Sequence, residues 1–303
     1  MYIIDFFKNL FKKNNVGVII WMALNLLLIT TWFGLALTAG DLGTTVSMMV
    51  VGLLLYAVSM MIALSPLGEW ILRLQNGCKK ITDPEVLARL QPLFEEVYAK
   101  AKAETPELSK KVRMFMSEDE CPNAFATGRN TVCVTRGLLS YSDEQIKGVL
   151  AHEFGHLAHK DTDTILVVAV GNLIVTVVFT VVRVLSNIFM GIGQFFSALF
   201  SDSWGGVFAS IFIGISRVVA DFMLVLLMRL WTQLGVWLCM HSSRKNEFRA
   251  DAYANTLGYG KELSEVLESF GTEKSAKGLF ASLAASHPEN ADRIAKLRAP
   301  ALA

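Results

Sequence analysis

Two long uncharged stretches near the N-terminus constrain the fold of this chain more than any other feature. No charged residue occurs between Lys13 and Asp41, or between Asp41 and Glu69. Each stretch exceeds the ~20 apolar residues that a helix needs to cross ~30 Å of hydrocarbon. Because only a short turn around Gly40–Gly43 separates them, they predict a hairpin of two transmembrane helices within residues 1–69. The first run is longer than the ~7–15-residue apolar core of a cleaved signal peptide, so we expect an uncleaved anchor.

The composition agrees with membrane spans joined to a soluble part. Of 303 residues, 53% are hydrophobic and the mean hydropathy is +0.44, which is too apolar for an ordinary soluble domain. The net charge of +1 gives no indication of a nucleic-acid partner. The four cysteines have no zinc-ribbon spacing, and we expect free thiols in a reducing compartment.

The basic residues that flank the hairpin predict its orientation. Three lysines precede it and three basic residues follow it: Lys8, Lys12, Lys13, Arg73, Lys79 and Lys80. The positive-inside rule then places the N-terminus and the chain from about residue 70 on the cytoplasmic side.

A second apolar region, residues 163–240, predicts about two further spans. Thr164–Val182 is uncharged and just long enough to cross a bilayer, whereas the later part contains Arg217, Asp221 and Arg229. Arg217 and Asp221 lie one helical turn apart and could neutralise one another, which favours a packing or interfacial role over a transport path. The expected fold is therefore a mainly α membrane protein with about four transmembrane helices.

Residues 70–162 have the pattern of a globular domain with a small β-sheet. Asp83-Pro84 is typical of a helix start, and Val112–Met116 and Thr131–Thr135 read as short strands. Ser142 begins a capping box, and an apolar stripe follows it at helical spacing. Residues 241–303 form the other polar segment, with three expected helices: Ser242–Thr256, Leu263–Phe270 and Pro288–Leu297.

The helix after Ser142 carries the sequence His152-Glu153-Phe154-Gly155-His156. Positions i and i+4 lie on one helical face, so both imidazoles can bind one zinc ion at about 2.0–2.1 Å. Glu153 lies beside such an ion and can accept a proton from a water molecule that the ion activates. The pattern is typical of zinc-dependent peptidases.

Two histidines leave a tetrahedral zinc short of one protein ligand. His159 lies ~10.5 Å along the helix from the first histidine, so we interpret it as a polar residue at the helix end. Glu247 and Asp251 lie one helical turn apart. Glu247 could bind zinc while Asp251 accepts the outer N–H of a ligand histidine. The alternative is an exposed acidic pair on a basic helix.

A shared metal ion also limits the topology. If His156 and Glu247 bind the same ion, the apolar block between them must return to the side from which it left. It therefore crosses the membrane an even number of times, which excludes three spans.

Several motifs keep a fixed order along most of the chain: Asn123–Gly128, Val134–Leu139, His152–His156, Asp161, Ser243-Arg244 with Glu247 and Asp251, and Ser286–Pro288 with Arg293. In these motifs the chain resembles the HtpX membrane metalloproteases, which are related to the CAAX prenyl proteases. The resemblance implies a gluzincin-like α+β metalloprotease domain with a small β-sheet. That domain would be divided between residues 70–162 and 241–303.

The resemblance also implies a role for each matched residue. It implies His152, His156 and Glu247 as ligands of one zinc ion, Glu153 as general base, and Asp251 as the hydrogen-bond acceptor behind a ligand. Residues Asn123, Ala124, Phe125 and Ala126 would form an edge strand that aligns the substrate backbone. His287 and Arg293 would stabilise the tetrahedral intermediate. The alternatives are a plain turn at Asn123–Gly128 and a helix start at His287-Pro288.

The expected function is that of a zinc metalloendopeptidase in the bacterial inner membrane. The resemblance implies unfolded or damaged membrane proteins as substrates, cleaved on the cytoplasmic side as part of a stress response. One alternative is a CAAX-prenyl-protease-like activity, although those enzymes use more spans. Another is a non-catalytic, zinc-stabilised scaffold, which would need no general base at Glu153.

Overall fold

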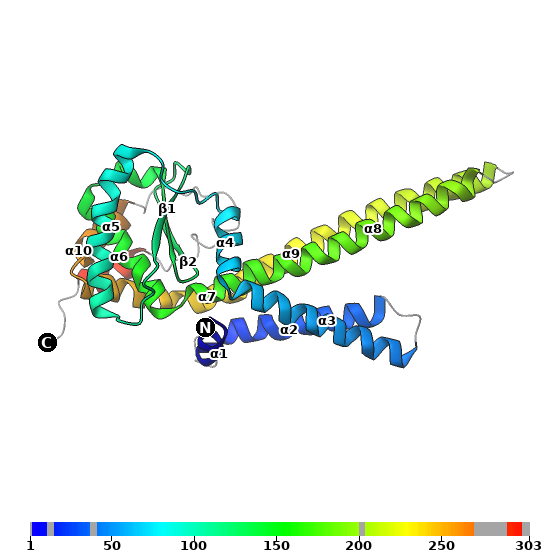
Figure 1. The fold of residues 1–303 in the computed structure, drawn as a ribbon, viewed down its shortest axis with the longest axis horizontal. Helices are drawn as coiled ribbons and strands as arrows, with labels where there is room; N and C mark the ends of the chain where they lie inside the picture. The colour runs from blue at the N-terminus through cyan, green and yellow to red at the C-terminus, as the bar shows by residue number, and fades with distance from the viewer. Residues whose placement is uncertain (1, 11–14, 37–40, 200–203, 270–289, 299–303) are drawn as a thin grey trace.

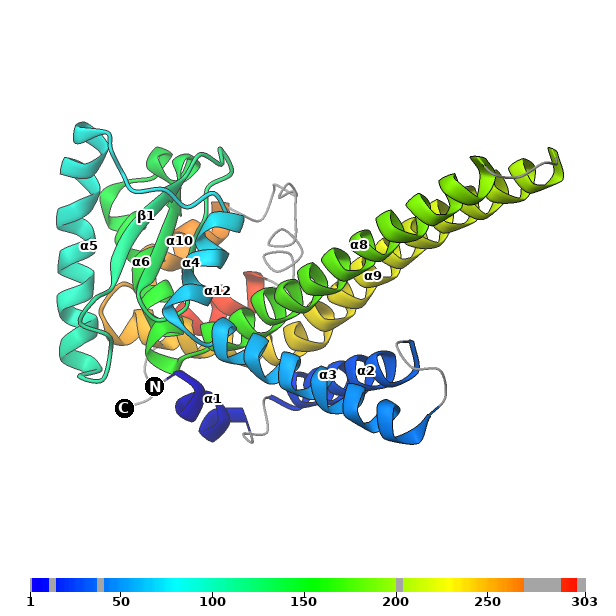
Figure 2. The same ribbon diagram turned by 45° about the vertical axis from the view of Figure 1, so that its right-hand side comes forward.

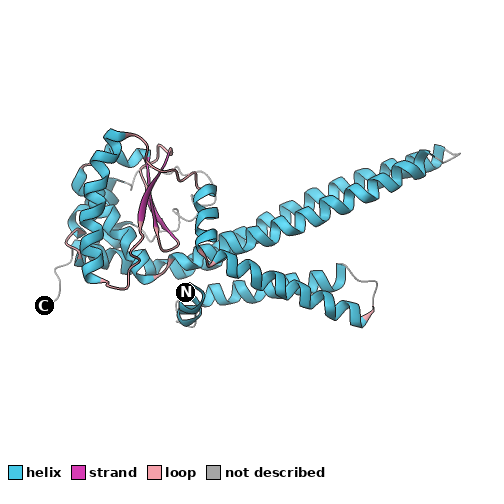
Figure 3. Cartoon of the chain, viewed as in Figure 1, coloured by secondary structure: helices cyan, strands magenta, loops and turns pink. Residues whose placement is uncertain are grey.

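The protein consists of a head of helices around a small sheet, from which two helical hairpins project toward the same side (Figure 1). The computed structural model describes residues 2–10, 15–36, 41–199, 204–269 and 290–298. Most of the described residues are helical, and Figure 3 shows the three strands in the middle of the head.

The N-terminal part contains a short helix, a hairpin and a helix that leads into the head: α1 (Tyr2–Leu10), α2 (Val16–Ala36), α3 (Leu42–Ala63) and α4 (Pro66–Gln75). Asp41 caps α3, since its Oδ2 accepts the backbone N–H of Thr44 at 2.7 Å. The two predicted helices are thus present as a helical hairpin, and both are long and apolar enough to cross a membrane.

The second hairpin begins directly after the end of α6 (Asp143–His159). It contains α7 (Thr162–Ile165), a π-helical segment η3 (Leu166–Gly171), α8 (Asn172–Leu199) and α9 (Trp204–Thr256). Helix α9 is 53 residues long, about 80 Å at 1.5 Å per residue, and its C-terminal part enters the head. The helix predicted at Ser242–Thr256 ends at Thr256 as expected, but it does not begin at Ser242. It continues α9, because no glycine or proline interrupts the chain between Gly235 and Gly258.

Three of the described helical segments are long and apolar enough to cross a membrane: Val16–Gly34, Leu42–Ala63 and Gly206–Gly235. The stretch Thr164–Val182, expected to be just long enough to span, runs through α7 and η3 into the start of α8 and is not one of these three. Helices α8 and α9 run side by side in both views, so the second hairpin returns the chain to the head (Figures 1 and 2). This return agrees with an even number of crossings.

The charges within the second hairpin pair between helices. Nε of Arg183 lies 2.6 Å from Oδ1 of Asp221, and Nη1 of Arg217 donates to Oε1 of Gln194 at 3.0 Å. The predicted neutralisation of Asp221 by Arg217 is therefore corrected, because Arg183 on the neighbouring helix reaches Asp221. These pairs hold α8 and α9 together.

The sheet contains β1 (Arg113–Ser117), β2 (Ala124–Thr127) and β3 (Thr131–Thr135) in the order β1-β3-β2. Strand β3 is parallel to β1 and antiparallel to β2. Strand β2 thus lies at an edge, as the resemblance implied for residues 123–126.

Five helices and the sheet share the core of the head. They are α5 (Pro84–Glu104), α6, the end of α9, α10 (Gly260–Ser269) and α12 (Asn290–Arg298), and a 3-10 turn, Arg136–Ser140, leads from the sheet to α6. Phe94, Val132, Leu150 and Phe154 are almost fully buried there. Segments before and after the second hairpin both contribute to this core. The exact domain boundaries stay predictions. A mainly α fold with membrane helices and a small mixed sheet is confirmed.

Candidate metal centre

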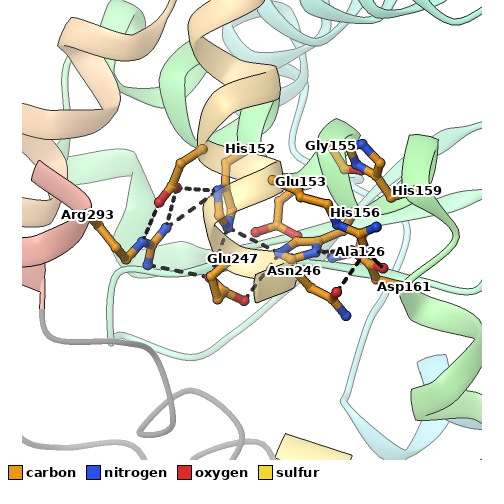
Figure 4. Close-up of polar contacts among 12 residues, drawn as sticks. Ala126, His152, Glu153, Gly155, His156, His159, Asp161, Asn246, Glu247 and Arg293 are labelled. Atoms are coloured by element: carbon orange, nitrogen blue, oxygen red, sulfur yellow. Dashed lines mark hydrogen bonds and ion pairs between the residues drawn. The ribbon is translucent and has the colours of Figure 1, made fainter. Parts of the chain in front are cut away.

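Helix α6 presents both histidines of the His-Glu-Phe-Gly-His motif on one face. Its first turn is fixed by a capping box, in which Ser142 and Gln145 exchange hydrogen bonds of 3.2 and 3.3 Å. The Nε2 atoms of His152 and His156 face one another at 3.2 Å (Figure 4). Both side chains are largely buried, so they are held in place by the surrounding protein.

Helix α9 brings Glu247 to these two histidines. One carboxylate oxygen lies 3.4 Å from Nε2 of His152, and the other lies 3.4 Å from Nε2 of His156. The helices approach closely because position 155 is glycine: a Cβ there would lie 2.8 Å from Cα of Ala250. A packing contact between α6 and α9 thus sets the position of Glu247.

The three ligand groups lie close enough together to share one zinc ion. Ligand atoms at about 2.0–2.1 Å from zinc lie about 3.3–3.4 Å from each other. The Nε2 atoms of the two histidines are 3.2 Å apart, and each lies 3.4 Å from a different oxygen of the Glu247 carboxylate. The donor set of two imidazoles and one carboxylate is a common one for zinc.

The charge around the group also suits a divalent cation. Four carboxylates and two guanidinium groups lie there: Glu153, Asp161, Glu247, Asp251, Arg249 and Arg293. Burial acts to lower the pKa of His152, but hydrogen bonds to Asp251 and Glu247 outweigh it, so the pKa of His152 is raised. The excess of negative charge therefore favours a cation between the histidines.

The outer nitrogen of His152 is bonded to a carboxylate that an arginine supports. Nδ1 of His152 lies 2.9 Å from Oδ1 of Asp251, and Arg293 donates to both oxygens of Asp251 at 2.6 and 2.8 Å. Burial acts to raise the pKa of Asp251, but the hydrogen bonds of Arg293 and His152 prevail and lower it to about 2. An ionised Asp251 keeps the proton on Nδ1, which leaves Nε2 available for a metal.

His156 has a similar arrangement that the sequence analysis missed. Nδ1 of His156 lies 3.4 Å from Oδ2 of Asp161, and Nη2 of Arg249 donates to Oδ1 of Asp161 at 2.8 Å. Lys160 ends α6 with φ of 60°, and this left-handed residue turns the chain so that Asp161 comes back toward His156. The sequence analysis quoted Asp161 for the resemblance but gave it no role.

Glu153 lies between the metal group and the edge strand. Its Oε2 accepts the backbone N–H of Ala126 at 2.7 Å (Figure 4). Thr135 donates its N–H to the carbonyl of Asn123. Because hydrogen bonding alternates along an antiparallel pair, Phe125 is the next residue whose backbone groups bond to β3. The backbone groups of Ala124 and Ala126 therefore face the open edge, whereas those of Phe125 face β3.

The structure brings six predicted site residues together: His152, Glu153, His156, Glu247, Asp251 and Arg293. Arg293 is 3% exposed and contacts Asp251 with two of its N–H groups. His287 lies outside the described residues. Nδ1 of His159 lies 2.7 Å from the carbonyl of Gly155, consistent with a polar residue at the helix end.

The apolar hairpins and the His-His-Glu group on two crossing helices define a class, the membrane metallopeptidases. A model described as "Peptidase family M48" matches residues 84–301, and the chain belongs to this family. The resemblance to the HtpX proteases is thereby supported by an independent finding.

Curated relatives named "Protease HtpX" match most of the chain. The protein of Hahella chejuensis (strain KCTC 2396) is 30% identical over 267 residues, which cover 77% of this chain and 80% of the relative. The protein of Pseudomonas aeruginosa (strain UCBPP-PA14) is 29% identical over 269 residues, covering 78% and 81%. These matches confirm the resemblance.

Among solved structures, the chain is similar to "Crystal Structure of S. mikatae Ste24p". The TM-score is 0.41 at 18% identity, and the alignment covers 98% of this chain and 66% of that one, just under two thirds of its length.

Proposed function

We propose that this protein is a zinc-dependent endopeptidase of the bacterial inner membrane. Its proposed substrates are unfolded or damaged membrane proteins, cleaved on the cytoplasmic side as part of a stress response. The observation that carries the proposal is the position of Glu153, between the His-His-Glu group and the open edge of β2.

The proposed zinc ligands are His152, His156 and Glu247, one ion per chain. When bound, zinc polarises the scissile carbonyl and lowers the pKa of a water molecule. Asp251 and Asp161 would orient the two imidazoles through their Nδ1 atoms.

Glu153 is the proposed general base. It would take a proton from the attacking water and transfer it to the leaving amine. The N–H of Ala126 holds its carboxylate 2.7 Å away, beside the strand where the peptide would lie. The edge-facing backbone groups of Ala124 and the carbonyl of Ala126 would pair with an extended substrate, with Phe125 in the same strand and Asn123 directly before it.

Arg293 and His287 are proposed to stabilise the tetrahedral intermediate. For Arg293 a second role is also proposed, supported by the two N–H groups that it donates to Asp251 and by its Nη1, which lies 3.5 Å from Glu247. Arg293 would thus support the ligand sphere and contribute positive charge near the reacting carbonyl.

The proposed orientation follows from the basic residues that flank the first hairpin. Both hairpins leave the head on the same side (Figure 2), so a head in the cytoplasm has its site near the membrane surface. A substrate segment that leaves the bilayer on the cytoplasmic side would therefore lie close to that site.

The test uses the full-length protein in detergent or nanodiscs, with one zinc ion per chain and an unfolded membrane protein as substrate. Glu153→Gln keeps the size of the side chain but removes the base, so it should retain zinc and lose cleavage by about 10²–10⁴-fold. Glu144→Gln, at an exposed position of the same helix, serves as the matched control and should cleave normally. Wild-type cleavage by Glu153→Gln would refute the mechanism, whereas full biological activity of a Glu153→Gln strain would revive a scaffold role.

A further inference from the structure

A buried polar cluster outside the metal site joins α1 to the turn that follows β2. We call it the α1 cluster; its members are Tyr2, Asp5, Glu69, Arg129, Asn130 and Asp163. They come from α1, α4, the β2–β3 turn and α7. None belongs to the metal group, yet the turn directly continues the strand that lies beside Glu153.

Glu69 of α4 fixes the conformation of this turn. It is 1% exposed, and its carboxylate accepts the backbone N–H groups of Arg129 and Asn130 at 3.3 and 3.2 Å. Oγ1 of Thr131 donates to it at 2.6 Å. Gly128 has φ of 60°, and a Cβ there would lie 2.6 Å from the Glu69 carboxyl group, so the turn requires glycine.

Arg129 ties the same turn to α1 and α7. Its guanidinium contacts carboxylate oxygens of Asp5 and Asp163 at 2.7 Å each, and it donates to the carbonyl of Tyr2 at 3.2 Å. It also lies 4.3 Å from the centre of the Tyr2 ring. Charge-assisted hydrogen bonds of a mostly buried arginine are among the stronger polar contacts in proteins.

Helix α1 is itself held from two other directions. The hydroxyl of Tyr2 donates to Glu69 at 3.0 Å, and Nζ of Lys160, directly after α6, lies 3.3 Å from Asp5. Phe6 and Leu10 are buried in a cluster with residues of α2 and α3. Helix α1 therefore connects the first membrane hairpin, the end of the ligand-bearing helix and the β2–β3 turn.

We propose that α1 is a positioning helix for the substrate-binding edge of β2, with Arg129 as the positioning residue. The inference rests on the proposed function, in which an extended peptide pairs with that edge. Ala126, whose N–H reaches Glu153, lies two residues before Gly128. Releasing the turn from α1 would loosen the edge on which the peptide binds and leave the metal ligands in place.

The experiment compares Asp5→Asn and Arg129→Gln with wild type in the full-length protein. Asp5 is the milder site because it is partly exposed, whereas Arg129→Gln leaves the buried Asp163 without its arginine. Both variants should increase deuterium uptake across residues 123–131. They should also raise KM for an extended peptide about five- to tenfold, with kcat within about twofold and zinc affinity unchanged.

The matched control is Arg136→Gln, which breaks the exposed contact to Glu118 at the other end of the β2–β3 hairpin. It should change neither deuterium uptake nor KM, because exposed ion pairs contribute little. Unchanged uptake in Asp5→Asn would overturn the inference whether or not the protein cleaves peptides. Increased uptake with unchanged KM would also overturn it, and absence of wild-type cleavage would instead refute the proposed function.

Discussion

Gly155→Ala tests whether the approach of α6 to α9 sets the metal geometry. A Cβ at position 155 would lie 2.8 Å from Cα of Ala250 and 3.1 Å from its Cβ. Carbon atoms prefer about 3.5–4.0 Å, so the helices would have to separate by about 1 Å. Metal–ligand distances hold within about 0.2 Å. The carboxylate of Glu247, which lies three residues before Ala250 on α9, would therefore move out of the distance at which it can share a metal ion with the two histidines.

The helix itself would gain from this substitution. Alanine is favoured over glycine by about 1 kcal/mol inside a helix, whereas overpacking costs about 1–3 kcal/mol. The net change in the free energy of unfolding is therefore small, about 0–2 kcal/mol destabilising. Zinc affinity should fall by about 10–100-fold, the loss that perturbed support of a ligand typically causes, which corresponds to about 1.4–2.7 kcal/mol.

The assay is a chelator-competition titration of zinc with full-length protein, beside a thermal unfolding curve. The matched control is Gly148→Ala on the same helix, where a Cβ would lie 2.7 Å from the backbone nitrogen of Leu263 on α10. That clash is directed away from α9, so this variant should lose stability and keep its zinc affinity. Wild-type zinc affinity in Gly155→Ala would refute the argument.

Three further predictions concern charged groups. Asp161→Asn removes the acceptor behind the second histidine and should weaken zinc binding about 10–100-fold in the chelator titration. Arg293→Met leaves the buried Asp251 without its two hydrogen bonds and should destabilise the protein by about 3–5 kcal/mol in chemical denaturation. The pKa of Glu96 is lowered to about 2, first by its hydrogen bond to Lys147; this stabilisation is present above the usual pKa near 4.5 and is lost as the pH falls toward 2. In Glu96→Gln, the unfolding temperature should therefore fall less steeply than in wild type as the pH is lowered from about 5 to about 2. The same steep fall in the variant would contradict this assignment.

Local signals in the sequence were sufficient for several elements. Ser142 and the two histidines lie within one helix, and the capping box and the i, i+4 spacing depend only on neighbouring residues. The hairpin of α2 and α3 follows from the absence of charge. The assignment of Glu247 as the third ligand required either the family resemblance or the crossing of α6 and α9 in the structure, because Glu247 lies far from the histidines in the sequence.

Other features could not be predicted because they depend on tertiary contacts. The role of Asp161 depends on the left-handed residue Lys160 and on Arg249 from a distant helix. The α1 cluster joins Arg129 to Asp5 across 124 positions of the chain, and no local pattern indicates such a pair. The continuity of α9 was missed because the change from apolar to polar residues near Met240 was interpreted as a helix end.

The most direct measurement is X-ray absorption at the zinc edge of the full-length protein loaded with one equivalent of zinc. We expect two imidazole nitrogens and carboxylate oxygen at about 2.0–2.2 Å, with the nitrogen contribution reduced in His156→Ala. Sulfur at about 2.3 Å, or a spectrum unaffected by His156→Ala, would contradict the assignment of His152, His156 and Glu247 as the metal centre.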